Sequence, residues 1–508
     1  MEAGETSQVI LLRQPVQRGE EWRTYALVFA VALFLTGLIA PYRDVHLPQL
    51  LVFAVGVMFV LVCMKFSVEE HERLMLVFCV FAPFQKVLPG DFSGIIRGFN
   101  VTNVFFFFLL LGWAMQTLRF ERRFYKRRSI DIPLAVFCLL GLVSLFRREL
   151  YSGEQTVLDS IFFMKEWLLP MIIYYIVVNS IRDRKTLVRL VVVVCITTAL
   201  VGFLGLKRFY LDKGGTYNVF SSYDKARIGV ICGQPNQLGA FFCYYTFLLL
   251  AFFAMRWRKL TYWFLLIPVV ACWRSAWLTF SRGAQVAFGV SFIAFVFLWS
   301  RKVFFFVLMP VVIFFACFPH LIPSIFVGRM ANTVRTDGTY DYSTQNRLAV
   351  WKHAIIMIKA NPFLGVGYDN FQRHIGDYGL PRNVRGIDAH NTYLLYAAEM
   401  GIPAALLFVV ILGMCFWKGM YVFIWSRDNF FRATSLGFVA GLTGLVVANV
   451  FGSRLNSNEV VFQFWILVAV IIRMAEVARE EKQERAERAD IEHRRKIADM
   501  VSHGPRVT

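Results

Sequence analysis

Long apolar runs recur along this chain from Tyr25 to Ile472. Each run is close to the ~20 residues that an α-helix needs to cross the hydrocarbon core of a bilayer. Apolar residues make up 57% of the 508 residues, above the roughly 45–50% of soluble domains. Because lipid cannot satisfy backbone polar groups, such runs must form helices. The sequence therefore predicts an all-α, polytopic membrane protein with about 12–14 transmembrane helices.

The candidate spans are the apolar runs that polar or basic gaps separate. They cover residues 22–40, 48–64, 74–88, 101–118, 132–146, 161–178, 187–206, 236–255, 260–280, 284–300, 303–318, 392–416, 433–451 and 459–474. The count is a range because Pro83 interrupts the run at 74–88 and because only Ser281–Gly283 separates one pair of runs.

The net charge of +20 is concentrated in short gaps between apolar runs. Basic clusters occupy 119–128, 182–185, 256–259 and 301–302, as the positive-inside rule requires of cytoplasmic loops. This placement indicates membrane lipids as partners, and no recognition motif supports nucleic-acid binding. If residues 1–21 are a cytoplasmic tail, every basic gap lies inside and the segment 319–391 lies outside.

The outward segment 319–391 is too long for an ordinary connection and is expected to be functional. Residues 347–359 alternate apolar and polar residues at helical spacing, which predicts a helix with Leu348, Trp351, Ile355 and Ile358 on one face. Pro362 is expected to end this helix before a tight turn. We predict a membrane domain over 22–474 with one large outward loop, 319–391, that caps its outer face.

The last segment, residues 475–508, has a different composition. Charged residues of both signs alternate with alanine at helix-supporting spacing. This pattern favours a solvated cytoplasmic helix over a coiled coil that binds a partner.

Cysteine and histidine patterns give no sign of a metal or cofactor. The nine cysteines lie in or beside apolar runs without a CxxC pair, so we expect small apolar residues rather than ligands or disulfides. The histidines show no HxH or HExxH spacing. We therefore predict neither a metal site nor a cofactor.

Four arginines lie on the predicted outward side, where the positive-inside rule disfavours them: Arg227, Arg282, Arg347 and Arg454. Arginine has a planar fork of donors that matches phosphate oxygens, and it stays charged at any relevant pH. Several arginines at one outward pocket would bind a diphosphate without a metal. The alternative, a side chain that reaches lipid headgroups, is favoured for Arg454.

His390 stands where the long loop meets a new apolar run, between Asp388 and Asn391. A histidine has an unperturbed pKa near 6.5, which suits a general base at physiological pH. Its position alone leaves a structural role open. Asn236, which follows Gly233 and Pro235, opens another span with polar atoms and is expected to line the same pocket.

Three ordered motifs then point to a known family. They are LTFSRGAQ, RLAVWKHAIIMIKANPFLGVGYDNF and DAHNTYLLYAAEMGIPA, within roughly residues 227–413. Together they resemble the superfamily of O-antigen ligases and O-antigen polymerases, bacterial inner-membrane enzymes that transfer lipid-linked glycans. The family implies about twelve membrane helices with a large periplasmic loop, which agrees with the parity of the loops.

The resemblance also implies a mechanism and a set of site residues. A glycan would pass from undecaprenyl diphosphate to an acceptor hydroxyl at the periplasmic face, with inversion and without a metal. Arg282 of the SRG motif and Arg347 of the RxxxW motif, which ends at Trp351, would bind the diphosphate. His390 of the HN motif, followed by Asn391, would take the acceptor proton. Arg227 matches the family pattern more loosely.

Three functions share these features. A ligase would move finished polysaccharide to a lipid A core acceptor, whereas a polymerase would join repeat units of O-antigen, exopolysaccharide or a related glycan. A transporter of the lipid-linked glycan is the third possibility, but transporters tend to have repeats and midplane sites, and neither is visible here. An O-antigen ligase-like glycosyltransferase is the favoured function.

Overall fold

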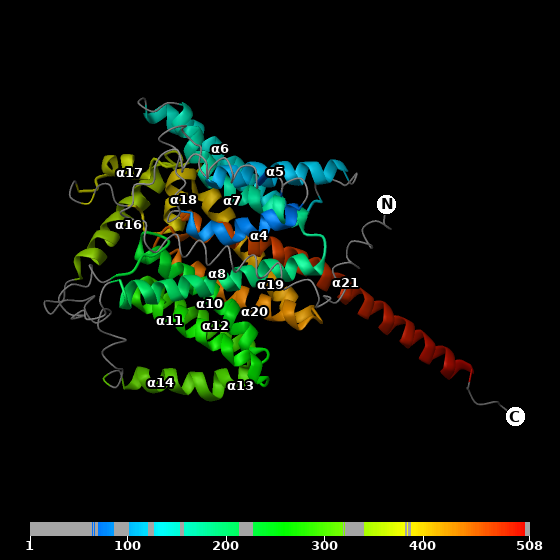
Figure 1. Cartoon of the computed structure of the whole chain (residues 1–508). Coiled ribbons are helices and arrows are strands. Elements are labelled where there is room, and N and C mark those ends of the chain that lie inside the picture. The colour runs from blue at the N-terminus through cyan, green and yellow to red at the C-terminus, as the bar shows by residue number, and fades with distance from the viewer. Residues whose placement is uncertain are drawn as a thin grey trace.

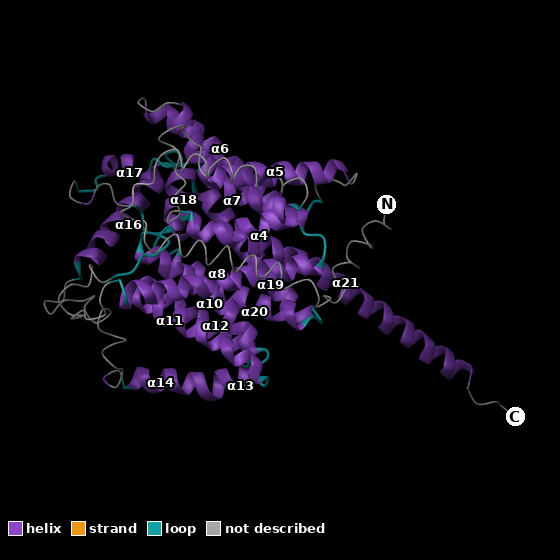
Figure 2. Ribbon diagram, in the orientation of Figure 1, coloured by secondary structure: helices purple, strands orange, loops and turns teal. Residues whose placement is uncertain are grey.

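The computed structural model describes residues 63–64, 66, 70–85, 101–119, 126–152, 157–212, 227–318, 320, 340–381, 384 and 388–502. Within these ranges the secondary structure is helical and no strand is present (Figure 2). This confirms the predicted all-α, polytopic membrane fold. The N-terminal tail at 1–21 and the predicted span at 22–40 lie outside the described residues, as does nearly all of the span at 48–64.

Seven helices in the described part are long and apolar enough to cross a membrane. Each matches a predicted span in position. They are α8 (Arg184–Tyr210), α10 (Pro235–Ala254), η2 with α11 (Leu260–Leu265 and Leu266–Leu278), α12 (Arg282–Trp299), α19 (Ile402–Trp425), α20 (Asn429–Ala448) and the first two thirds of α21 (Asn458–Ser502). The total of 12–14 spans stays a prediction.

Further apolar helices pack around these seven. On the N-terminal side they are α4 (His71–Phe81), η1 (Ala82–Phe84), α5 (Val101–Arg119), α6 (Asp131–Ser152) and α7 (Val157–Ser180). Between α12 and the long loop, a continuous helical stretch consists of α13 (Arg301–Val303), η3 (Phe304–Leu308) and α14 (Met309–Cys317). The short elements near the site are α16 (Tyr342–Ala360), α17 (Phe371–His374), η5 (Ile375–Tyr378), α18 (Thr392–Met400) and η7 (Arg454–Asn456).

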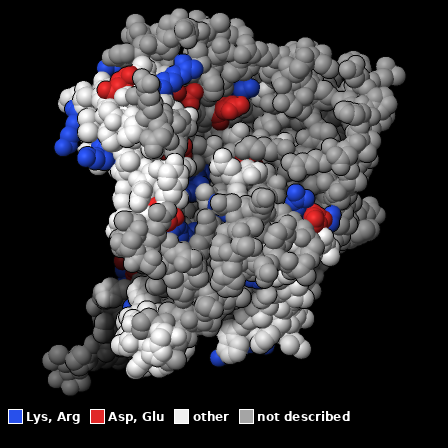
Figure 3. All heavy atoms as spheres, turned by 90° about the vertical axis from the view of Figure 1, so that its left-hand side faces the viewer, with Lys and Arg blue, Asp and Glu red and all other residues white. Residues whose placement is uncertain are grey.

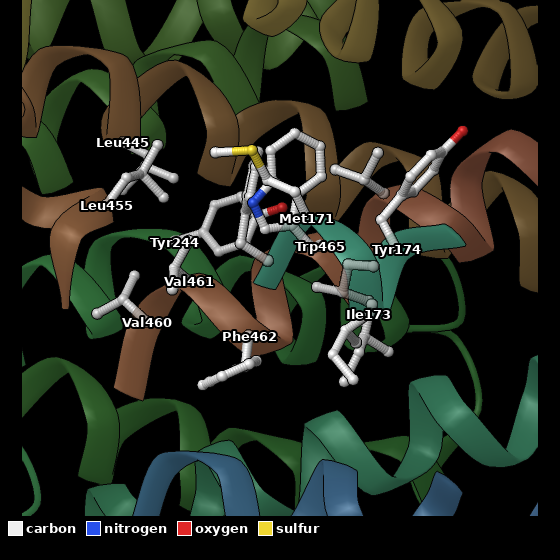
Figure 4. Close-up of a cluster of buried hydrophobic side chains, with 14 of the residues drawn as sticks. Met171, Ile173, Tyr174, Tyr244, Leu445, Leu455, Val460, Val461, Phe462 and Trp465 are labelled. Atoms are coloured by element: carbon white, nitrogen blue, oxygen red, sulfur yellow. The ribbon is translucent and has the colours of Figure 1, made fainter. Parts of the chain in front are cut away.

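The core of the bundle is built around the first part of α21, whose spanning window is 94% buried. Its apolar side chains lie between those of α7 and α10, as Figure 4 shows for Trp465, Tyr174 and Tyr244. The Tyr245 hydroxyl donates to the Val460 carbonyl oxygen at 2.6 Å, so a polar atom in this dry region is satisfied. Beyond the bundle, α21 continues without a break past residue 474 and extends away from the other helices (Figure 1).

Local sequence signals set where several of these helices begin. Asp183 and Asp428 cap α8 and α20, since each carboxylate accepts a backbone N–H of the first turn at 2.7 and 2.8 Å. Pro235 stands at the first turn of α10, where its missing N–H costs no hydrogen bond.

One predicted span is wrong in its continuity. The apolar run at 392–416 is two helices, α18 and α19, which meet at Gly401 with φ of +90°. A Cβ at Gly401 would lie 2.1 Å from the Phe363 carbonyl oxygen, so the chain breaks where the turn after α16 packs against it. Ile402 N donates to the Pro362 carbonyl oxygen at 2.8 Å and joins the two segments.

The predicted helix at 347–359 is confirmed, because α16 spans Tyr342–Ala360 and ends just before Pro362. Its predicted apolar face is wrong. The buried residues are Val350, Ala354, Met357 and Ile358, whereas Leu348 and Ile355 are 46% and 45% exposed. The face turned inward is rotated from the expected one, with Ile358 common to both, and α16 packs against α18.

Candidate active site

Four connections meet at one end of the bundle, at the left of Figure 1. They are the segment 227–234 before α10, the turn between α11 and α12, the segment 361–391 after α16, and the turn between α20 and α21. A cavity of about 460 Å³ lies among them. Its wall contains Gln234, Asn236, Gln237, Tyr368, Asp369, Phe371, Gln372, Arg373, Asp388, His390, Leu395, Glu399, Ser453, Arg454 and Asn456.

His390 is held at this wall by bonds on both sides of it. The residue itself has φ of +50°, a left-handed conformation that costs energy for a side chain other than glycine. On one side, the Trp351 indole N–H donates to the Ala389 carbonyl oxygen at 2.9 Å. On the other, the Asn391 side chain caps α18 by accepting N–H groups of Tyr393 and Leu394 at 3.0 and 3.1 Å. The strained turn is therefore fixed rather than free.

The imidazole of His390 is about one third exposed, and its Nδ1 lies 3.9 Å from an Asp388 carboxylate oxygen. Burial lowers the pKa of His390 below its usual 6.5, and the nearby charges of Arg347 and Arg454 lower it further. The Asp388 carboxylate acts in the opposite direction but does not outweigh them. The ring is therefore neutral at physiological pH, the state that a general base requires.

Arg347 lies on α16 close enough for its charge to act on both His390 and Arg454. It sits at the edge of the buried face of the helix, near Val350 and Ala354. The structure thus brings two of the predicted residues, Arg347 and His390, to one place.

Arg282, at the start of α12, is engaged by a carboxylate. Its Nη1 and Nη2 donate to the two carboxylate oxygens of Asp341 at 3.1 and 2.8 Å, a bidentate ion pair. Burial raises the pKa of Asp341, but hydrogen bonds from Arg282 and Thr344 outweigh it and leave this pKa below its usual range. Because Asp341 directly precedes α16, the pair links α12 to the helix that bears Arg347. Arg282 is not part of the cavity wall.

Arg227 and Asn236 occur together. Arg227 Nη2 donates to the Asn236 side-chain oxygen at 2.8 Å, and its Nε donates to the Thr279 carbonyl oxygen at 3.0 Å. Asn236 in turn lines the cavity. The expectation that Asn236 helps to line the site is met, and Arg227 reaches the site through it.

Backbone strain gathers at the same end of the molecule. In the described part of the chain, four residues other than glycine have positive φ: Val230, Phe280, Asp369 and His390. Each lies in one of the connections around the cavity, and Asp369 and His390 form part of its wall. Strained residues persist only where the surrounding structure holds them, and they concentrate at functional sites.

Sequence reasoning missed two further groups at the cavity. Arg454 was assigned to the lipid headgroups but is only 6% exposed and lines the cavity. Glu399 is 4% exposed at another part of the wall, and its carboxylate accepts the Phe371 N–H at 3.1 Å. A charged residue nine positions after His390 in an apolar run was the available signal for Glu399.

Where residues are described, no group of three His, Cys, Asp or Glu side chains is placed to hold a metal ion. That the site works without a metal or a cofactor stays a prediction. Figure 3 looks onto the end of the bundle that carries the site, with charged side chains of both signs and blue Lys or Arg atoms in a recess near its centre.

These features define a class: an all-helical, polytopic membrane protein with a polar site, lined by charged side chains of both signs, at one end of its bundle. Residues 267–409 match the family model described as Wzy_C: O-Antigen ligase. The matched segment contains Arg282, Arg347, Trp351 and His390. The match over this part of the chain supports the resemblance to the O-antigen ligase superfamily and indicates a membrane glycosyltransferase-like enzyme. No curated protein matches the chain.

Proposed function

We propose that this protein transfers a glycan from undecaprenyl diphosphate to an acceptor hydroxyl, as an O-antigen ligase-like glycosyltransferase. The observation that carries the proposal is the position of His390 in the wall of a polar cavity, where the charges of Arg347 and Arg454 act on its imidazole. A base beside fixed positive charge suits a reaction that removes a proton from one substrate and releases an anion from the other.

The proposed reaction is a single displacement. The acceptor oxygen attacks the anomeric carbon while His390 takes its proton. The bond from this carbon to the diphosphate oxygen breaks, and its electron pair leaves with the diphosphate. Attack opposite the leaving group inverts the anomeric centre, and the leaving group needs charge stabilisation rather than a proton or a metal.

The arginines have distinct parts in this proposal. Arg347, nearest to the base, stabilises the charge on the leaving diphosphate. Arg282 binds the same group after a phosphate displaces Asp341 from its bidentate fork, since both ligands offer paired oxygens. Arg227 orients Asn236 in the cavity wall. Trp351 and Asn391 hold the turn that bears the base.

We place the protein in the bacterial inner membrane with this site at the periplasmic face. The helix ends opposite the site carry the basic connections at 182–185, 256–259 and 301–302. Basic connections of this length stay in the cytoplasm. The cavity at the other end then faces outward, where lipid-linked glycans would meet an acceptor.

The test is transfer by the purified, full-length protein in liposomes that contain undecaprenyl-diphosphate-linked glycan and a lipid A core acceptor. We expect the wild type to form the acceptor-linked product, and His390→Ala to insert and bind donor without transfer. The matched control is His374→Ala, at a histidine that is paired with Asp377 and is not part of the cavity wall, which should keep wild-type transfer. Wild-type rates in His390→Ala would remove the base assignment.

The product also separates the related functions. Glycan joined to the core acceptor indicates a ligase, and longer chains on undecaprenyl diphosphate indicate a repeat-unit polymerase. Movement of the intact lipid-linked glycan across the bilayer, without a new glycosidic bond, would contradict an enzyme and indicate a transporter.

A further inference from the structure

Arg454 lies in the wall of the cavity that contains His390, and it carries a charge that the protein does not neutralise. The residue is 6% exposed. Among the described residues, its guanidinium has one hydrogen-bond partner, the Phe451 carbonyl oxygen, 2.8 Å from Nη2. No carboxylate in the described ranges pairs with it, in contrast to Arg282 and its partner Asp341. Nε and Nη1 of Arg454 are left for a ligand.

Neighbouring charges add to the uncompensated positive charge of Arg454. Burial lowers the pKa of Arg454 to about 10, and the charges of Arg347 and Arg227 act in the same direction. The Asp388 carboxylate attracts it from a distance and offsets only part of this. Three guanidinium groups that repel one another around a cavity are stabilised when an anion enters it.

The backbone is arranged to keep this guanidinium in place. A Cβ at Gly452 would lie 2.2 Å from Cζ of Arg454, so the glycine leaves the space that the side chain fills. The Asn449 side-chain oxygen accepts the backbone N–H of Arg454 at 3.2 Å and the Thr392 hydroxyl at 2.6 Å. Since Thr392 begins the helix just after His390, Asn449 fixes the base and the arginine relative to each other.

We propose that Arg454 is a binding residue for the diphosphate of the lipid-linked donor. This inference rests on the proposed function, because it takes the anion to be the leaving group of that reaction. Diphosphate fits better than a carboxylate or a single phosphate because its oxygens can contact Arg454 and Arg347 together. The carboxyl group of Asp369, elsewhere in the wall, would repel an anion and leave that side of the cavity to sugar hydroxyls.

The experiment uses inorganic pyrophosphate as probe and the purified, full-length protein in detergent, so that it needs neither glycan nor transfer. Titration calorimetry measures its affinity, and thermal unfolding measures its effect on Tm. We expect pyrophosphate to raise the Tm of the wild type, and Arg454→Gln to bind it at least tenfold more weakly. Arg454→Gln without ligand should unfold at the wild-type temperature or above, because a buried uncompensated charge has been removed.

Two further variants sharpen the result. Arg274→Gln is the matched control: this arginine is at the same end of the bundle, bonded to the Tyr210 hydroxyl and outside the cavity wall, and its loss should leave pyrophosphate binding unchanged. Gly452→Ala keeps the arginine but occupies its space, and should weaken binding as well. This variant also provides a test if Arg454→Gln fails to fold.

Several outcomes would overturn the proposal. One is wild-type affinity for pyrophosphate in both Arg454→Gln and Gly452→Ala. Another is protection of the wild type by a sugar monophosphate but not by pyrophosphate, which would assign the site to a phosphorylated acceptor.

A different outcome separates this proposal from the proposed function. Loss of pyrophosphate binding in Arg454→Gln, in a protein that transfers no glycan in liposomes, would support the anion site and count only against the proposed function.

Discussion

Trp351 and Ala389 are joined by a hydrogen bond of 2.9 Å, from the indole N–H to the carbonyl oxygen of the residue that precedes His390. The bond connects α16 to the turn that bears the proposed base. Trp351→Phe removes the donor but keeps an aromatic ring. A hydrogen bond of this kind contributes about 1 kcal/mol net, so we expect kcat to fall roughly five- to tenfold with little change in donor affinity.

A matched tryptophan is available for this test. The Trp263 indole N–H donates to the Trp257 carbonyl oxygen at 2.8 Å, far along the chain from the site. Trp263→Phe loses the same type of bond and should keep wild-type kcat. A larger effect of Trp351→Phe on donor binding than on kcat would place Trp351 at the donor instead of behind the base.

The pH dependence of transfer follows from the lowered pKa of His390. A base must be neutral, so activity is present above this pKa and is lost as the pH falls through it. Because burial and the nearby arginines place the pKa below 6.5, the acidic decline of kcat/KM should have its midpoint below pH 6.5. A decline centred above pH 7 would contradict a buried neutral imidazole.

Asp388→Asn tests the direction in which the acidic limb of this pH profile shifts. The Asp388 carboxylate, 3.9 Å from Nδ1, stabilises the protonated ring. Its removal should lower the pKa of His390 further and move the acidic limb of the profile to lower pH. Movement to higher pH would show that another group titrates. Asp377→Asn, at a carboxylate paired with His374 instead, should leave the limb where it is.

Two glycines test the junction between the turn after α16 and the break between α18 and α19. Gly365 and Gly401 have φ of +64° and +90°, and a Cβ at either would lie within 2.3 Å of backbone atoms across the junction. Alanine at either position must therefore separate the segments. We expect the free energy of unfolding to fall by more than ~1 kcal/mol and the transfer rate to fall as well. Thermal unfolding in detergent, monitored through the exposure of the buried cysteines, measures the change in stability.

Gly413 is the control for these variants. It lies within α19, and a Cβ there would meet nothing within 4 Å. Gly413→Ala should be neutral or stabilise the helix by roughly 0.5–1 kcal/mol. Equal losses in all three variants would show that the glycines matter for helix packing in general and not for this junction.

The sequence predicted the helical fold because apolar length in a bilayer leaves helices as the available structure. It also predicted what depends on chemistry within a few positions: the turn after α16, and the place of Asn391 at the start of α18, where it caps the helix. The inward face of α16 was predicted incorrectly because residues 348–358 are apolar at every position except Lys352 and His353, so that periodicity alone does not single out one face. Only the packing against α18 decides between Ile355 and Ala354.

The arginines show the same limit. Composition and the positive-inside rule picked out four outward arginines, but their roles depend on partners distant in sequence. Arg282 is 59 residues from Asp341, and no local pattern connects them. Arg454 is distinguished by what it lacks, since the described structure gives it no carboxylate. An isolated sequence cannot show such an absence.

Arg347→Lys tests whether geometry matters at the donor site as well as charge. Lysine keeps the positive charge but loses the planar fork that binds two oxygens together. We expect kcat/KM for transfer to fall at least tenfold, or about 1.4 kcal/mol. The control is Lys352→Arg on the exposed face of the same helix, which should have no effect. Full activity in Arg347→Lys would show that Arg347 contributes only its positive charge and not its bidentate geometry.

The orientation of the whole molecule can be tested from the segment between α16 and α18. Gly379 lies in this segment, but its φ of +90° makes a cysteine there strained. Asp377, whose side chain is 70% exposed, is a better position. Asp377→Cys should react with a thiol reagent that cannot cross the membrane when the reagent is added to the periplasmic side of spheroplasts.

The native cysteines make this experiment clean. Eight of the nine are buried or half-buried, and Cys317 at the end of α14 is exposed, so Cys317→Ser removes the background. A cysteine in place of Arg427, which is exposed between α19 and α20, lies at the opposite helix ends and should react only after the membrane is opened. Reaction of Asp377→Cys only in opened membranes would place the cavity in the cytoplasm and would rule out a periplasmic transfer site.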